Sequence, residues 1–589
     1  MHPTPKSREL PVLTAVRVVC REWPQVEALD HVGRLLDEYL DGSQPWSLPQ
    51  ACAAGHLHLL DRIGAKQAED LAKMDELQCQ ALCTAAMANA AAAGRVQILQ
   101  WLAEYFPGAR VTKAVEEAAK NGHVHVLQWL HESKLDVFWG ARELLLAVRN
   151  GHLQTAQWLH EHTTPPEDQF LIDEAARNGD LTMIQWLHGA SGECTANAVA
   201  HAATGGHLEV VRWLSDNCFS LCPSIRMDQA AANGHLEVIQ WLHENDSRCT
   251  TNAMNTAAAN GQLEVVQWLH ENRHEGCERA AMDQAAVNGH LEMVQWLHQN
   301  RREGCTTIAM NGAARRGFFD VVQWLHENRS EGCTTKAMDN SAANGHLEIV
   351  QWLHSHRPEG CTAAAMDGAA ANGHLDVVEW LHDQRTEGCT AAAMDDAALN
   401  GHLDVVRWLH GNRQEGCTTM AMDNAAANGH LETVQWLHTH REEGCTTNAM
   451  DRATRQGDFD MVKWLHAHRN EGCSLFGMNN AVGAGRLDIL QWLHVTYGMG
   501  CNSRAMEAAA FGGHFDILAF LHREGLATCT ADVSIKAVAE GHLEILQWLF
   551  RHYPEPIQPA RLLRIAKRHD LYCVDWLVST GKAVDSAMW

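Results

Sequence analysis

The chain has 589 residues, of which 46% are apolar and 20% are charged, and its formal net charge at pH 7 is −26. This composition is typical of a folded protein and excludes disordered or collagen-like chains. Nucleic acids and anionic membranes are bound by clustered Lys and Arg, so the acidic balance predicts that neither is a partner.

The compartment is indicated by what the sequence lacks. It contains no stretch of about 18 uninterrupted apolar residues, and its first twenty residues contain no compact apolar run that ends in a small-residue cleavage site. Its 19 cysteines are too sparse for a secreted disulfide scaffold. We therefore expect a cytoplasmic protein, with access to the nucleus left open.

Internal repetition is the main feature of the sequence. An aromatic residue recurs about every 28 residues in 18 repeats, from Trp101 to Trp576, with Phe520 replacing Trp once. Gly stands seven residues before this aromatic in 17 of the 18 repeats, and a degenerate repeat precedes them around Gly55. Fixed periods of 20 to 50 residues indicate repeat architectures. We expect a capping segment at 1–46, a solenoid of about 18 or 19 repeats at 47–580, and a tail at 581–589.

One central repeat, residues 333–360, shows the expected local structure. A threonine, Thr334 or Thr335, can cap a first helix of about ten residues, and Asn344-Gly345 ends it because Gly adopts the left-handed turn conformation. A second helix follows, with polar positions left for solvent. Its expected buried residues are Leu347, Ile349, Val350, Trp352 and Leu353. Stacked copies of such a helical hairpin form an all-α solenoid, with no room for a substantial strand in each repeat.

The segment AMDNAAANGHLETVQWLH, residues 421–438, resembles the ankyrin repeat, whose helices begin TPLHLAA and GHxEIVxLLL. Ala425-Ala426 match the family's Ala pair, and Gly429-His430 match its Gly-His. The WLH and EGCTT variants are similar to expanded ankyrin-like families of oomycetes. The resemblance implies a stacked-hairpin fold and a protein-binding function. The period of 28 is shorter than the family's 33, so we expect its hairpin loops to be reduced to plain loops.

The cysteines and histidines of the repeats form regular columns. The thirteen column cysteines run from Cys194 to Cys529, and neighbouring copies are expected about 10 Å apart, too far for a disulfide. We predict unpaired, buried thiols and no metal. The His residues that end WLH are expected to stabilise the C-terminus of the second helix, although a pH-dependent role stays open. Arg and Glu pairs in the loops, such as Arg357 with Glu359, are expected to be exposed ion pairs.

An acidic column on the first helix is the preferred candidate for contact with basic partners. Variable positions on the same helix could provide specificity. The candidate partner-binding residues are Asp283, Asp339, Asp367, Asp395, Asp423, Asp451, Lys336, Met420 and Asn448.

Nothing in the sequence indicates catalysis. No P-loop or nucleophile-elbow motif occurs, and the HExxH string at 270–274 is best explained as loop variation. We predict a non-enzymatic, monomeric scaffold or adaptor without a cofactor or metal, whose partners are proteins of basic or repetitive character. A substrate-recruiting or inhibitory subunit of a separate enzyme complex is the alternative.

Overall fold

The computed structural model describes residues 48–582 with several gaps. The gaps are most of 56–75 and the segments 107–109, 112, 134, 138, 140–141, 164–169, 191–193, 219–226, 246, 503 and 570. The predicted capping segment 1–46 and most of the predicted tail 581–589 lie outside the described residues. Among the described residues, none of the helices combines the length and the apolar character that a membrane span requires.

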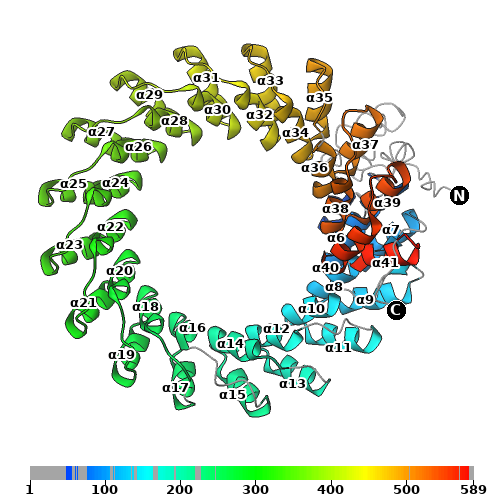
Figure 1. Ribbon diagram of the computed structural model, residues 1–589, viewed down its shortest axis with the longest axis horizontal. Helices are drawn as coiled ribbons and strands as arrows, with labels where there is room; N and C mark the ends of the chain where they lie inside the picture. Colours follow the sequence, from blue (N-terminus) through cyan, green and yellow to red (C-terminus); the bar gives the residue numbers. More distant parts are fainter. Residues whose placement is uncertain are drawn as a thin grey trace, which may run out of the picture. The chain divides into compact units, whose positions relative to one another are not determined.

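The chain divides into two compact units, and Figure 1 labels the helices that form them. The central unit is Ala176–Ala505, and the terminal unit combines Met1–Ala175 with Met506–Trp589. Both are built from pairs of short helices, as the repeat pattern predicts. α12 (Leu171–Asn178) spans one division between the units, and α36 (Ala505–Gly512) begins at the other.

The central unit contains a first and a second helix in each repeat. The first helices are α14 (Ala196–Gly205), α16 (Met227–Ala232), α18 (Thr251–Ala259), α20 (Arg279–Val287), α22 (Thr307–Arg316), α24 (Thr335–Ala343), α26 (Ala363–Ala371), α28 (Ala391–Leu399), α30 (Thr419–Ala427), α32 (Thr447–Gln456) and α34 (Leu475–Gly483). The second helices are α13 (Leu181–Gly189), α15 (Leu208–Asn217), α17 (Leu236–Glu244), α19 (Leu263–Asn272), α21 (Leu291–Asn300), α23 (Phe319–Asn328), α25 (Leu347–His356), α27 (Leu375–Gln384), α29 (Leu403–Asn412), α31 (Leu431–His440), α33 (Phe459–His468) and α35 (Leu487–Tyr497).

The predicted capping and turn residues have the expected roles. Thr334 has an extended backbone, and its hydroxyl accepts a hydrogen bond from the Lys336 amide at 3.3 Å, so it is the N-cap of α24. Gly345 follows α24 with φ +75°, the left-handed conformation that disfavours residues with a Cβ. Local chemistry therefore defines both ends of the first helix.

Packing explains how the two helices of a repeat differ. The first helices bury mainly Ala and one Met, such as Met338, and consecutive first helices pack closely together. Consecutive second helices, which carry Trp, contact one another sparsely. The close spacing on one side and the wide spacing on the other place the first helices on the inner side of the central unit's curve (Figure 1).

The buried face of the second helix agrees with the prediction in part. Ile349, Val350 and Leu353 are buried, whereas Leu347 and Trp352 are only half-buried. The Trp352 ring lies against the edge of His326 from the preceding repeat, with the ring centroids 5.1 Å apart. Trp352 therefore contributes to the contacts between repeats rather than to a fully enclosed core, whereas Trp101 and Trp548 of the terminal unit are buried.

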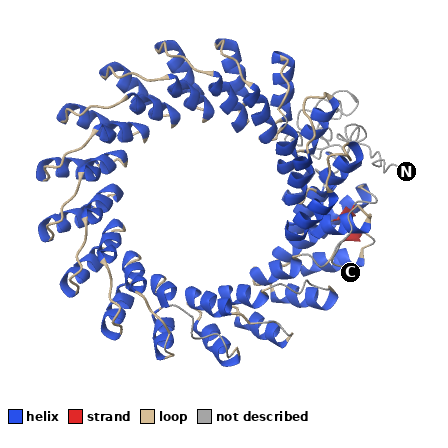
Figure 2. Cartoon of the chain, viewed as in Figure 1, coloured by secondary structure: helices blue, strands red, loops and turns tan. Residues whose placement is uncertain are grey.

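The terminal unit contains the remaining elements. They are α4 (Leu48–Ala54), α6 (Glu76–Ala92), α7 (Val96–Tyr105), β1 (Arg110–Val111), α8 (Ala114–Lys120), α9 (Val124–Glu132), β2 (Asp136–Val137), α10 (Glu143–Arg149), α11 (Leu153–His162), α37 (Phe515–Arg523), α38 (Ala531–Ala539), α39 (Leu543–His552), α40 (Pro559–His569) and α41 (Leu571–Ser579). β1 and β2 form a short parallel pair (Figure 2).

The terminal unit also brings together distant parts of the sequence. α6 packs against α37 and α39, and the Thr84 hydroxyl donates a hydrogen bond of 2.8 Å to the Glu544 carboxylate in a buried position. The hydrogen bond gives the buried Glu544 carboxylate a partner, which such a group requires. Residues 460 positions apart in the sequence are therefore in direct contact.

Candidate protein-interaction surface

One position on each first helix from α18 to α34 faces solvent. It is the second residue of the helix, and in most repeats its amide donates to the N-cap hydroxyl while its side chain points outward. We call these residues the contact row. The contact row is Asn252, Ala280, Ile308, Lys336, Ala364, Ala392, Met420, Asn448 and Phe476, all exposed.

The contact row carries large apolar side chains that the fold does not require. The exposed fraction is 53% for Ile308, 55% for Met420 and 69% for Phe476, and the neighbouring Leu475 is 52% exposed. Contiguous apolar patches on soluble proteins indicate interaction sites, whereas single exposed apolar residues are common, so it is the recurrence of such side chains in one row that indicates binding. Because the side chain at this position changes from repeat to repeat while the buried positions repeat, the row can encode specificity.

A shallow hollow of about 430 Å³ lies beside the row between α20, α22 and α24. Ile308 and Lys336 line it together with Val287 and Gly312. A Cβ on Gly312 would lie 2.2 Å from a methyl group of Val287, so glycine is needed for the close approach of α20 and α22 there. The hollow gives the contact row a pocket of mixed character, in which Val287 and Ile308 lie among polar and cationic side chains.

The predicted aspartates lie at the junctions between repeats. In each case the carboxylate accepts two hydrogen bonds from the next repeat's N-cap residue, one from its amide and one from its hydroxyl. These pairs are Asp283 with Thr306, Asp339 with Thr362, Asp367 with Thr390, Asp395 with Thr418, Asp423 with Thr446 and Asp451 with Ser474. Asp228, which is not one of the predicted residues, pairs with Thr250 in the same way.

Burial follows from these junction contacts. Asp283, Asp395, Asp423 and Asp451 are 4–5% exposed, and Asp339 and Asp367 are half-buried. The aspartates thus join each repeat to the next, and direct contact of these carboxylates with a partner stays a prediction. The other three candidates, Lys336, Met420 and Asn448, all lie in the contact row. Sequence reasoning missed Ile308 and Phe476, although both occupy the same column as those three.

The loops after the second helices form a second repeated set of contacts, in which an Arg of one repeat bonds its own Glu and reaches the preceding repeat. We call these contacts the loop ladder. The Arg357 guanidinium donates to Glu359 at 2.5 Å, and these side chains are only 21% and 24% exposed, so the expectation of exposed ion pairs is wrong there. In the next repeat, Arg385 reaches back to His354, with 3.2 Å between its Nη1 and the imidazole Nδ1. Each Arg is half-buried because it is packed between its own Glu and the preceding repeat.

The column cysteines are part of this ladder. Cys305 is buried, and burial, followed by the charge of Glu331, raises the pKa of its thiol to about 11. Such thiols remain protonated and are weak nucleophiles at neutral pH.

The HExxH string is divided between secondary-structure elements, because α19 ends at Asn272 and His274 lies in the following loop.

The prediction of unpaired column cysteines is wrong at Cys194. Cys194 and Cys218 form a disulfide with 6.2 Å between their Cα atoms. The expected distance of about 10 Å separates neighbouring cysteines of the column, whereas Cys218 lies outside the column and closer to Cys194. The column cysteines from Cys249 to Cys529 are free, and Cys222 lies outside the described residues.

Comparison with known families agrees with the repeat geometry. Residues 227–311 match a family model described as ankyrin repeats (3 copies), and residues 338–382, 361–410 and 389–438 match one described as ankyrin repeats (many copies). Ankyrin repeats are thus detected in residues 227–311 and 338–438 of the chain. In these ankyrin repeats the segment between α25 and α26 is a plain loop without a strand, as the short period predicts. No curated protein matches the chain.

Solved structures give distant similarities to another class of helical repeat. The crystal structure of the pentatricopeptide repeat protein PPR10 from maize is 11% identical, with 93% of this chain and 96% of that chain covered and a TM-score of 0.27. The same protein in complex with an 18-nt psaJ RNA element is 10% identical, with 93% and 98% covered and a TM-score of 0.28.

The RNA complex corrects the prediction that nucleic acid is excluded as a partner. A solved structure with a distant similarity to this chain is a complex with an RNA, and the exclusion is withdrawn. With TM-scores this low, the similarity assigns neither RNA nor any other ligand to this chain.

Proposed function

We propose that this ankyrin-repeat protein is a non-catalytic scaffold that binds partner proteins along the contact row of its central unit. The exposed apolar side chains of Ile308, Met420 and Phe476 on an otherwise regular row are the observation that carries the proposal. Burying one such side chain contributes roughly 1.5–3 kcal/mol. Several contacts along one rigid row could therefore give a stable complex.

The spacing of the row indicates what kind of partner it fits. Consecutive first helices pack at about 8–10 Å, so the row presents similar contact positions at regular intervals. A partner with apolar side chains at a matching spacing could bind several repeats at once, which raises its overall affinity. We place this function in the cytoplasm, where the free column thiols would stay reduced.

The proposal can be tested by photo-crosslinking. A photoreactive phenylalanine at position 308 or 420 should capture a protein in an extract of the source cells, whereas the same group at exposed Glu348 on α25 should capture less. Equal capture from both helices would contradict the proposal. An enzyme among the captured proteins would favour the alternative of a recruiting or inhibitory subunit.

Point variants then test the row with the purified partner. Ile308→Asp and Met420→Asp should each weaken binding at least tenfold, or about 1.4 kcal/mol. Acidic residues in the first turn of a helix are favourable, so these variants should fold normally. Glu348→Gln is the matched control and should leave the Kd unchanged. Normal binding by both aspartate variants would refute the placement of the site.

A further inference from the structure

The repeat that contains Trp213 lacks the Arg, the Glu and the Gly of the loop ladder, and has Cys218, Ser220 and Leu221 in their places. In the regular repeats an Arg stands five residues after the Trp, and it faces two groups of the preceding repeat. Arg301, for example, places Nη1 3.3 Å from the His270 Nδ1, and its charge acts on the thiol of Cys277. In the repeat of Trp213 this position is Cys218.

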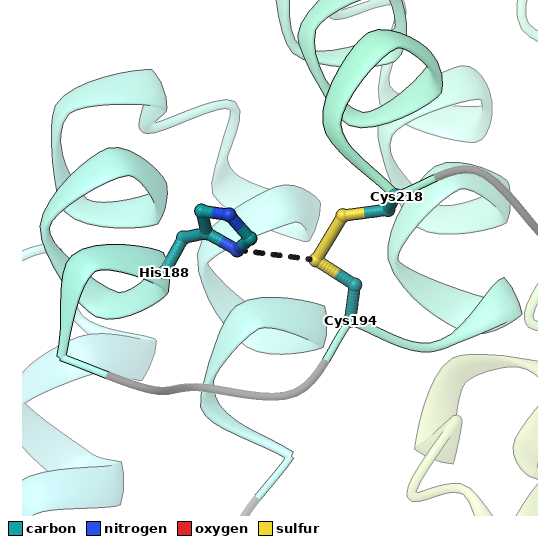
Figure 3. Close-up of side chains that lie close together, drawn as sticks. All are labelled: His188, Cys194 and Cys218. Carbon is teal, nitrogen blue, oxygen red and sulfur yellow. Dashed lines mark hydrogen bonds between the residues drawn. A yellow bond between two sulfur atoms is a disulfide. The ribbon is translucent and has the colours of Figure 1, made fainter.

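The substitution places three potential metal ligands together. Cys194 precedes Cys218 by 24 residues, the same separation as between Cys277 and Arg301. The His188 Nδ1 lies 4.0 Å from the Cys194 Sγ and points toward it (Figure 3). One ligand atom from each of the three residues lies within 4.8 Å of the others. It is the one group of three His, Cys or acidic side chains this close within the described part of the chain.

We infer that His188, Cys194 and Cys218 form a binding site for a thiophilic divalent cation, zinc above all, when the two cysteines are reduced. Two thiolates and an imidazole are a ligand set found at zinc sites in which a fourth position holds water. Zinc–sulfur distances of about 2.3 Å place tetrahedral sulfur ligands roughly 3.8 Å apart. The present separations require only small shifts to reach that geometry.

The reduced and oxidised forms are connected by balanced steps. A thiol reductant transfers two electrons and two protons to the Cys194–Cys218 disulfide, which gives two thiols, while two thiols of the reductant become a disulfide. Zinc binding then displaces one proton from each cysteine, and a neutral His188 supplies the lone pair of Nδ1. The disulfide and the metal complex exclude one another because they use the same sulfur atoms.

The neighbours of the thiol distinguish this cluster from the same place in other repeats. A regular repeat holds an Arg guanidinium beside its thiol, paired with a Glu carboxylate, in the place where Cys218 stands here. Cys218 adds a ligand. The bound ion would link α13, the start of α14 and the end of α15, so it would join two successive repeats at the loop edge of the central unit.

The test is a cobalt titration of the full chain after reduction with a phosphine and removal of the reductant. We expect one Co²⁺ per chain, with thiolate charge-transfer absorption and the visible bands of tetrahedral cobalt, both displaced by Zn²⁺. Cys218→Ser should abolish these bands. Cys277→Ser, at the regular site with Arg301, is the matched control and should retain them.

A second variant separates a loss of ligands from a loss of structure. His188 is exposed, so His188→Ala should fold normally and should weaken Co²⁺ binding at least tenfold. The oxidised chain should bind no cobalt at this site. The assignment would be overturned if the reduced chain bound no Co²⁺. It would also be overturned if Cys218→Ser kept the cobalt bands, or if His188→Ala kept the wild-type affinity for Co²⁺.

Discussion

Replacing Asp423 with alanine tests how successive repeats are joined. The Asp423 carboxylate is 4% exposed and accepts hydrogen bonds from the Thr446 amide at 2.7 Å and from the Thr446 hydroxyl at 2.6 Å. Thr446 is the N-cap of α32, and its hydroxyl in turn accepts from the Asn448 amide. The substitution therefore removes a charged acceptor and leaves a partly buried amide without its partner.

The expected loss follows from these contacts. A hydrogen bond to a charged group contributes about 1.5–3 kcal/mol, and an unsatisfied buried donor costs about 1–3 kcal/mol. The two bonds share one carboxylate and are not fully additive, so we expect Asp423→Ala to destabilise the junction by about 2–4 kcal/mol. Asp423→Asn should cost less, because Asn311 occupies the same position of another repeat and bonds Thr334 through both its oxygen and its nitrogen.

Hydrogen exchange is the appropriate assay because repeat proteins open locally. In Asp423→Ala, protection of the amides in α32 should fall roughly 30- to 700-fold, since each 1.4 kcal/mol corresponds to a factor of ten. Asp404→Ala, at an exposed acid of α29, should leave protection unchanged. A fall of less than about threefold in Asp423→Ala would refute the view that the aspartate column joins the repeats.

Three further predictions follow from the repeats. Gly345→Val should destabilise the folded protein by more than about 1 kcal/mol, because φ at this residue is +75° and a Cβ would lie 2.6 Å from the His374 ring. An unchanged thermal melting curve would contradict this prediction. Trp352→Ala should lower the free energy of unfolding, measured with a denaturant, by about 2–4 kcal/mol, which is less than the loss expected for a fully enclosed Trp. An unchanged free energy of unfolding would exclude a role of Trp352 in the packing between repeats. The hydrogen bond from Arg413 lowers the pKa of Glu415, although partial burial acts in the opposite direction. The pair therefore stabilises the fold at pH values above 4.5, the ordinary pKa of Glu, and this stabilisation is lost as the pH falls below that value. The stability difference between wild type and Arg413→Gln should therefore be present at pH 7 and decrease as the pH falls below 4.5 and through the lowered pKa of Glu415. A difference independent of pH would contradict the assignment.

Much of the repeat could be predicted because its determinants are close in sequence. Thr334, Gly345 and the apolar spacing of α25 act within one or two helical turns, and the structure confirms the ends and the type of both helices. The partial burial of Trp352 was less accessible to prediction, since it depends on how far apart neighbouring second helices lie. Likewise, the half-buried position of Arg357 depends on the preceding repeat.

The sequence by itself determined the period, the two helices of each repeat and the ankyrin resemblance, because 28-residue copies show these features independently of their neighbours. Only the tertiary structure decided which polar column is buried and which row is exposed. Asp423 and Met420 lie on the same helix, yet the aspartate bonds the next repeat and the methionine faces solvent. The pairing of Cys194 with Cys218 and the contact of Thr84 with Glu544 were decided there as well. These contacts join residues at least 23 positions apart, so they depend on how repeats pack rather than on local spacing.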